Sequence, residues 1–168
     1  CFALSGIGEA ARRAGAELVL PEERLFRNMT VKDARLIRNW PVLLGALAGA
    51  TRLIGVAPVK DHHRSGASMG MKNWYGILGG QRSRLHQRIN ESLVDLAAFV
   101  RPALTVVDAY RVLMRNGPTG GSLDDVELKR TLVASTDPVA ADAYLAKTYW
   151  DIDYQRLGSN ADNTMDVL

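Results

Sequence analysis

An apolar run of strand length at residues 52–59 (RLIGVAPV) limits the fold of this chain more than any other feature. Its apolar residues do not alternate with polar ones, which is typical of a strand buried on both faces of a parallel sheet. Residues 104–107 and 130–134 are two further apolar runs of this kind. We therefore expect a sheet in which residues 52–59 form a central strand.

Helical patterns lie between and after these expected strands. Between the first two runs, apolar residues recur at helical spacing at Leu85, Ile89, Leu93, Leu96 and Val100. After the third run, Asp137 and Pro138 supply the capping carboxylate and the first-turn proline of a helix start. Strands that alternate with helices predict an α/β fold, with a mostly parallel sheet, helices on both faces and a Rossmann-like layered architecture.

The length of the chain suits one domain. It has 168 residues, of which 47% are hydrophobic, so we expect residues 1–168 to form a single α/β domain around one core. The sequence begins at Cys1 rather than Met, and we interpret it as a fragment of a longer chain in which an export signal would not be visible. No apolar run approaches the roughly 18 residues of a membrane span. Localisation stays open, with a soluble, cytoplasmic protein as the default expectation.

Charge and cysteine content narrow the classes of partner. The net charge of +3 and the pI near 9.2 weakly favour anionic ligands. Basic residues are scattered and aromatic residues make up only 7% of the chain, so nucleic-acid binding is not expected. A single cysteine cannot hold an iron–sulfur cluster within this chain, and the sequence identifies no other cofactor.

The polar segment at residues 60–73, directly after the first strand, is the main candidate for a ligand site. Residues 60–80 (KDHHRSGASMGMKNWYGILGG) place two lysines, two histidines and an arginine beside several glycines. Cationic side chains next to accessible backbone N–H groups suit a carboxylate or a phosphate. The alternative is a solvated basic loop, which composition alone would favour. His62 and His63 should point in opposite directions on an extended backbone, and we favour His62 as the ligand-facing residue.

Other polar residues are expected at the same edge of the sheet. Ligands of open parallel sheets bind beyond the carboxyl ends of the strands, so Asp108 and Asp137 should lie near Lys60. Asp137 should also cap its helix whatever the function is. Asp142 either faces solvent or reaches towards this edge. The loop that contains Asn116 and Gly117 either approaches a ligand or forms a tight turn.

A metal site is not expected, although one combination stays open. His62 and His86 could join a carboxylate such as Asp108 around a metal ion. No HExxH motif or comparable spacing supports that arrangement.

Three segments together resemble the domain-of-unknown-function family 362, namely VAPVKDHHRSGASMGMKNWYGI, LTVVDAYRVLMRNGPTGG and LVASTDPVAADAYLA. The resemblance spans about residues 50–150. It implies as site residues Lys60, His62, Lys72, Asn73, Asp108, Asn116, Gly117, Pro118, Asp137 and Asp142. It also implies relatives that carry a ferredoxin-like iron–sulfur module and are sometimes exported, so an iron–sulfur domain or protein is a candidate partner.

Two functions follow from this sequence. In the first, an enzyme or enzyme subunit holds an anionic small molecule with Lys60 and Lys72, orients it with Asn73, and transfers protons through His62 or Asp108. In the second, the chain is a non-catalytic binding or scaffold domain for an electron-transfer module. Exposed side chains of Trp74, Tyr75 and Ile77 would support the scaffold.

Overall fold

The structure is a computed structural model that describes residues 3–152. Its strands are β1 (Arg27–Met29), β2 (Trp40–Val42), β3 (Ile54–His62), β4 (Gly66–Ser68), β5 (Leu104–Leu113) and β6 (Val126–Ser135). Its α-helices are α1 (Ile7–Arg13), α2 (Leu44–Leu47), α3 (Gly70–Asn73), α4 (Arg82–His86), α5 (Ile89–Phe99) and α6 (Pro138–Trp150). Short 3-10 turns are η1 (Glu23–Leu25), η2 (Trp74–Ile77) and η3 (Leu123–Asp125).

The main sheet has the strand order β4-β3-β5-β6. Only β3 and β5 are parallel, whereas β4 pairs antiparallel with β3 and β6 pairs antiparallel with β5. The predicted mostly parallel, Rossmann-like sheet is therefore wrong. The physical reason lies in the connections, because a parallel pair needs a long crossover and only the segment between β3 and β5 contains helices of that kind. β5 and β6 are joined by a glycine-rich loop and the single turn η3, which returns the chain antiparallel.

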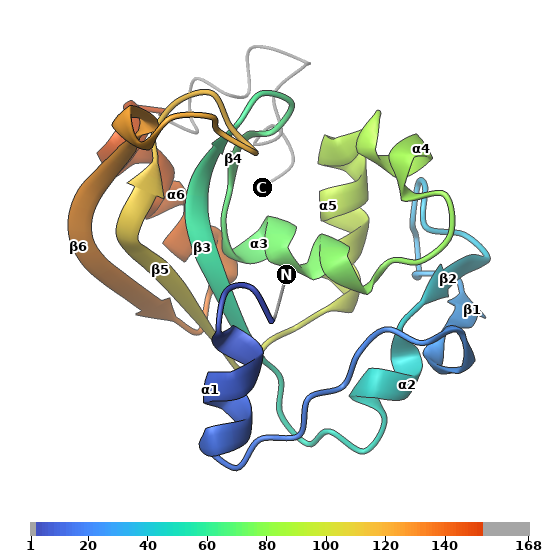
Figure 1. The fold of residues 1–168 in the computed structure, drawn as a ribbon. Helices are drawn as coiled ribbons and strands as arrows, with labels where there is room; N and C mark the ends of the chain where they lie inside the picture. Colours follow the sequence, from blue (N-terminus) through green and yellow to red (C-terminus); the bar gives the residue numbers. More distant parts are fainter. Residues whose placement is uncertain (1–2, 153–168) are drawn as a thin grey trace.

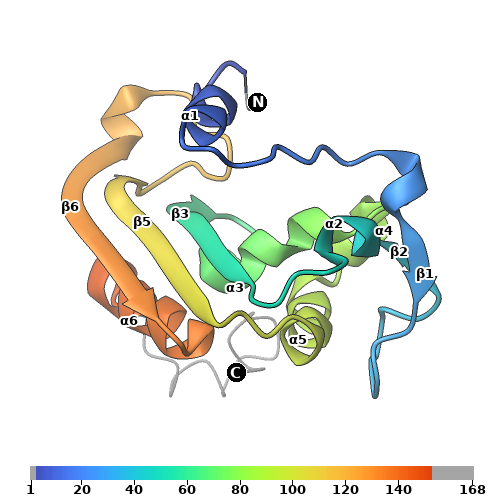
Figure 2. The same ribbon diagram turned by 90° about the horizontal axis from the view of Figure 1, so that it is seen from below.

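The two faces of the sheet are covered unequally, which also differs from the expected architecture. On one face, α6 packs Leu145 and Ala146 against Val107 and Val112 in a buried cluster. The other face leaves large apolar side chains exposed, including Ile54 (58%), Val56 (64%) and Leu132 (69%). Figures 1 and 2 show α6 on one side of the sheet and α1 on the other.

A second buried cluster surrounds α5. Ile37, Val42, Leu78 and Leu96 lie in it with almost no exposed surface. Within it, the buried Asp95 carboxylate accepts backbone N–H groups from Arg35, Leu36 and Ile37, which fastens the segment before β2 to the helix. These three bonds satisfy a carboxylate that would otherwise be costly to bury.

The segment made of α3 and η2 runs between the two clusters. Met69, just before it, belongs to the cluster under α6, and Tyr75 within it belongs to the cluster around α5. Figure 1 shows α3, α4 and α5 on the β4 side of β3, away from β5 and β6. Lys72 and Asn73 therefore sit on a segment that is held at both ends.

Several local predictions are confirmed. Asp137 caps α6 by accepting the N–H groups of Val139 and Ala140, and Pro138 is the first residue of that helix. The expected helix near residues 85–100 is present as α4 and α5, and its five periodic apolar residues are all buried.

None of the helices within residues 3–152 has the length and the apolar composition of a membrane-spanning segment.

Candidate functional site

Basic side chains converge where β3 ends. Lys60 and His62 are on β3, His63 follows in the turn to β4, Lys72 is on α3 and His86 ends α4. We call these five residues the histidine–lysine cluster. The cluster forms because α3 lies beside the β3–β4 hairpin (Figure 1) and because the ring of His86, at the end of α4, contacts the ring of His62.

The rings of the cluster are in close contact. The centroids of His62 and His63 are 5.3 Å apart with an interplanar angle of 4°, and those of His62 and His86 are also 5.3 Å apart. Tyr75 meets the His86 ring edge to face, and Lys72 Nζ lies 5.7 Å from the Tyr75 ring centroid. The expectation that His62 and His63 point apart is wrong, because His63 lies beyond the last residue of the extended strand.

The backbone fixes the tautomer of His62. Its Nδ1 atom accepts the N–H groups of Arg64 and Ser65, each at 3.2 Å, so Nδ1 carries no proton. The side chain is only 1% exposed. Burial, followed by the charges of Lys72, His86, His63 and Lys60, lowers the pKa of His62 to about 4. At neutral pH, His62 is therefore an uncharged ring that presents its Nε2–H as a donor.

The charges of the cluster all have the same sign. Burial lowers the pKa of Lys72, with a further contribution from Lys60. Burial also lowers the pKa of His86, together with the charges of Lys72, Arg64 and His63. Neither Lys60 nor Lys72 forms an ion pair with a carboxylate of the described residues. A negative ligand would relieve this repulsion.

His62 should make the stability of the protein depend on pH. Its pKa of about 4 in the folded state lies below the ordinary 6.5, so the unfolded chain takes up a proton first as the pH falls. We expect the free energy of unfolding to fall from pH 6.5 towards pH 4, by no more than about 1.4 kcal/mol per pH unit for this one group. Urea titrations across this range should show a shallower decline for His62→Asn.

The titration of Asp142 changes the free energy of unfolding in the opposite direction over part of this pH range. Burial raises its pKa to about 6, although the N–H bonds from Met71 and Gly70 counteract the shift. Its proton uptake in the folded state favours folding as the pH falls through 6. The comparison of wild type with His62→Asn cancels this contribution, because Asp142 is present in both. Identical pH profiles would contradict the assignment.

Asp142 holds the start of α3. It is 5% exposed, and its two carboxylate oxygens accept the N–H groups of Gly70 and Met71, each at 2.9 Å. A side chain at position 70 would lie 2.7 Å from Thr105 and 3.0 Å from Asp142, so glycine permits this approach. The solvent-facing alternative for Asp142 is wrong. The residue lies 70 positions after Lys72, and it positions the helix that carries Lys72.

Asn116 and Gly117 anchor the β5–β6 loop beside the cluster. Gly117 N–H donates to Asp61 Oδ2 at 2.7 Å, and Asn116 Nδ2 donates to Asp125 Oδ2 at 2.9 Å. A Cβ atom on Gly117 would lie 1.8 Å from the Asp61 carbonyl oxygen. The same glycine places its own carbonyl oxygen 3.3 Å from His63 Nδ1. This loop thus sets the orientation of a cluster residue.

Asp108 and Asp137 do not join the cluster. β5 continues to Leu113, so Asp108 lies within the strand opposite Pro58, and its carboxylate accepts the Tyr110 N–H. Asp137 follows Ser135, which pairs with Thr105 near the start of β5. It therefore lies at the opposite end of the sheet from Lys60. The expected common edge is wrong for Asp137 because β6 is antiparallel.

Asn73 is close to the cluster but has a structural partner. Its Nδ2 group donates to the Val56 carbonyl oxygen at 3.1 Å, beside a part of β3 that β4 does not cover. Tyr75 was not a sequence-based candidate for ligand binding, and His86 was considered only for a metal site. No sequence signal linked either residue to His62, because their contact depends on how η2 and α4 pack.

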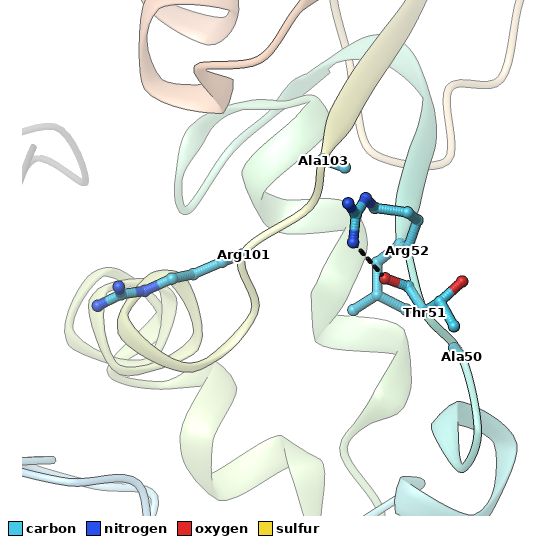
Figure 3. Close-up of a pocket in the computed structure, with 6 residues that line it drawn as sticks. Ala50, Thr51, Arg52, Arg101 and Ala103 are labelled. Carbon is cyan, nitrogen blue, oxygen red and sulfur yellow. Dashed lines mark hydrogen bonds between the residues drawn. The ribbon is translucent and has the colours of Figure 1, made fainter.

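A hollow of about 340 Å³ lies at the other end of the sheet, lined by Ala50, Thr51, Arg52, Leu53, Arg101 and Ala103. Figure 3 shows Arg101 extending away from Arg52, whose guanidinium donates to the Thr51 carbonyl oxygen. The two charged side chains that line this hollow, Arg52 and Arg101, do not converge on a common point. Across the described part of the chain, no group of three or more His, Cys, Asp and Glu residues is arranged to hold a metal ion.

Comparison with models of protein families identifies the family of this chain. The model of a family described as a domain of unknown function (DUF362) matches residues 1–147. No curated protein and no solved structure matches this chain.

Proposed function

Since this chain belongs to the DUF362 family, whose function is unknown, we propose from its own geometry that the histidine–lysine cluster binds the oxyanion group of a small molecule, either a carboxylate or a phosphate. The observation that carries this proposal is the convergence of five basic side chains without a carboxylate partner among the described residues. Charges of one sign held together are costly unless a counter-charge joins them.

Burial supports a binding site over a solvated basic loop. His62 is buried and Lys60 and Lys72 are half-buried, whereas a solvated loop would expose such side chains. Lys60 and His62 are held by β3, and Lys72 is held by α3. A pre-positioned set of donors loses little conformational entropy when a ligand binds.

The cluster contains two lysines, which carry charge, and three imidazole rings, of which His62 is a neutral donor. Lys60 and Lys72 supply the charge that attracts an anion, and His62 supplies a directed N–H bond from its Nε2 atom. An enzyme built on this site would use the same groups to stabilise negative charge that develops on a substrate oxygen. A neutral imidazole can donate to such an oxygen without giving up a proton.

The scaffold alternative loses its main sequence-based support. Tyr75 is only 8% exposed, and Trp74 and Ile77 are half-buried, so this segment packs inward. The iron–sulfur partner implied by the family resemblance remains a prediction.

Lysine substitutions test the proposed site. We expect Lys60→Ala and Lys72→Ala each to weaken binding about tenfold or more, because each removes one charge-assisted contact worth about 1.5–3 kcal/mol. The double variant should lose measurable binding. Isothermal titration calorimetry with acetate, citrate and inorganic phosphate would give the affinities, and circular dichroism would verify the fold.

Lys32→Ala is the matched control for these variants. Lys32 is an exposed lysine between β1 and β2, outside the cluster. Its loss changes the net charge by as much as Lys60→Ala or Lys72→Ala alone. Its affinities should equal those of the wild type. Wild-type affinity in the Lys60/Lys72 double variant, or an equal loss in Lys32→Ala, would refute the proposed site.

A further inference from the structure

We infer that His62 and His63 form a donor–acceptor pair, and that the anion bound beside them is a phosphate that still carries one proton. This inference rests on the proposed anion site and specifies its ligand. It depends on three backbone contacts that fix the hydrogen positions of neighbouring rings.

The donor of the pair is His62. Two backbone N–H groups point at its Nδ1 atom, so that nitrogen must present a lone pair. A neutral imidazole has a single N–H, which then lies on Nε2. Protonation of Nδ1 would set its new N–H against both backbone donors, so His62 is unsuited to accept a proton from a ligand.

The acceptor of the pair is His63. Its Nδ1 atom lies 3.3 Å from the Gly117 carbonyl oxygen, which can only accept a hydrogen bond. Nδ1 must therefore carry the hydrogen in the neutral ring, and Nε2 retains a lone pair. His63 is exposed, so this lone pair is not enclosed in the protein core.

The two rings stand side by side with opposite hydrogen-bonding character. They are parallel within 4° and 5.3 Å apart between centroids. The charged and titratable groups around them are Lys60 on the same strand, Arg64 in the turn, Lys72 on α3 and His86 on α4. Lys60, Arg64 and Lys72 attract an anion, whereas His86, whose pKa is lowered below its usual value, is uncharged at neutral pH. The Asp61 carboxylate, which accepts the Gly117 N–H, is the negative group nearby. None of these groups replaces the lone pair of His63.

Hydrogenphosphate satisfies both rings, whereas sulfate satisfies only one. Both are tetrahedral dianions of similar size, and either can accept the His62 N–H. Only hydrogenphosphate has an O–H that it can donate to His63 Nε2. Sulfate would bring its own lone pairs against that nitrogen, and a polar site discriminates strongly against a ligand that leaves its groups unpaired. Because His63 is exposed, we expect a modest selectivity of about tenfold to a hundredfold.

Titration calorimetry at pH 7.5 and constant ionic strength tests this selectivity with inorganic phosphate and sodium sulfate as probes. Wild type should bind phosphate at least about tenfold more tightly than sulfate. Glycerol 2-phosphate is the third probe, because a phosphate ester with a second pKa near 6 has lost its last proton at this pH. Glycerol 2-phosphate should bind as weakly as sulfate. This result would identify free phosphate, rather than a phosphate ester, as the ligand.

Two asparagine variants separate the roles of the rings. His63→Asn retains an N–H for the Gly117 carbonyl but has no Nε2 lone pair, so the preference for phosphate should fall to nearly one. His62→Asn retains an oxygen that can accept the two backbone N–H groups but has no N–H donor in the place of Nε2. It should weaken phosphate and sulfate alike and leave their ratio unchanged.

Nitrogen chemical shifts of the imidazole rings provide a measurement that needs no ligand. Long-range proton–nitrogen correlation spectra should show the Nε2–H tautomer for His62 and the Nδ1–H tautomer for His63. The same tautomer in both rings, or sulfate binding as tight as phosphate binding, would overturn the inference. If none of the three anions bound but acetate or citrate did, the inference would fail and the proposed site would stand. If the carboxylates also failed to bind, the proposed site itself would fail as well.

Discussion

Gly117→Ala is expected to destabilise the protein by about 4 kcal/mol or more, which is at the upper end of the range for single substitutions. The added Cβ atom would lie 1.8 Å from the Asp61 carbonyl oxygen and 2.4 Å from its carbonyl carbon. Both are backbone atoms of β3, so they cannot move aside as a flexible side chain would. The hydrogen bond from the Gly117 N–H to Asp61 Oδ2 would be lost when the loop shifts.

Urea denaturation followed by circular dichroism would measure this loss. Gly121→Ala is the matched control, because it lies in the same loop and its Cβ atom would meet nothing within 4 Å. We expect the control to change stability by less than about 0.5 kcal/mol. Equal stabilities of the two variants would show that the loop does not pack on β3 as described.

Asp142→Ala is expected to cost about 3 kcal/mol and to weaken anion binding as well. The substitution leaves the N–H groups of Gly70 and Met71 without their carboxylate partner in a buried site, and each unsatisfied donor costs about 1–3 kcal/mol. Removal of a buried carboxylate offsets part of this cost, since burial raises the pKa of Asp142 to about 6. The start of α3 would loosen and Lys72 would lose its fixed position.

Urea denaturation and phosphate titration calorimetry would measure the two effects. Asp137→Ala is an informative control, because Asp137 also accepts two backbone N–H groups, but at the exposed start of α6. We expect it to cost about 1 kcal/mol, the usual value for a helix cap, and to leave anion affinity unchanged. An Asp142→Ala protein that binds phosphate with wild-type affinity would show that Asp142 supports the fold without positioning Lys72.

The local elements could be predicted from the sequence because they depend on neighbouring residues. The apolar run at residues 52–59 corresponds to most of β3, and the Asp137-Pro138 pair correctly marked the start of α6. Lys60, His62 and Lys72 were identified as one basic group because they follow one strand within a short segment. Lys60 and His62 are close because they are two residues apart on β3, whereas the β3–β4 hairpin and α3 bring Lys72 back beside them.

The direction of β6 could not be read from its residues. An apolar run predicts that a strand is buried, but its composition is the same whether the strand runs parallel or antiparallel to its neighbour. The short loop between β5 and β6 contains the relevant signal, because no crossover helix fits there. Because β6 is antiparallel to β5, Asp137 lies at the far end of the sheet from Lys60.

Two contacts of the site were decided only by tertiary structure. Asp142 reaches Gly70 and Met71 across about 70 residues, and no spacing in the sequence links a residue on α6 to the start of α3. The opposite tautomers of His62 and His63 likewise depend on backbone groups of the β4 turn and of the loop at Gly117.

The sequence by itself therefore determined where the three long strands β3, β5 and β6 and the helices α4, α5 and α6 lie, and which segment carries the basic side chains. Tertiary structure alone decided which polar groups meet there and which ring nitrogen bears a hydrogen. The physical reason is that secondary structure follows from short-range periodicity and capping, whereas hydrogen-bond partners at a site are supplied by strand direction and by loops distant in the chain.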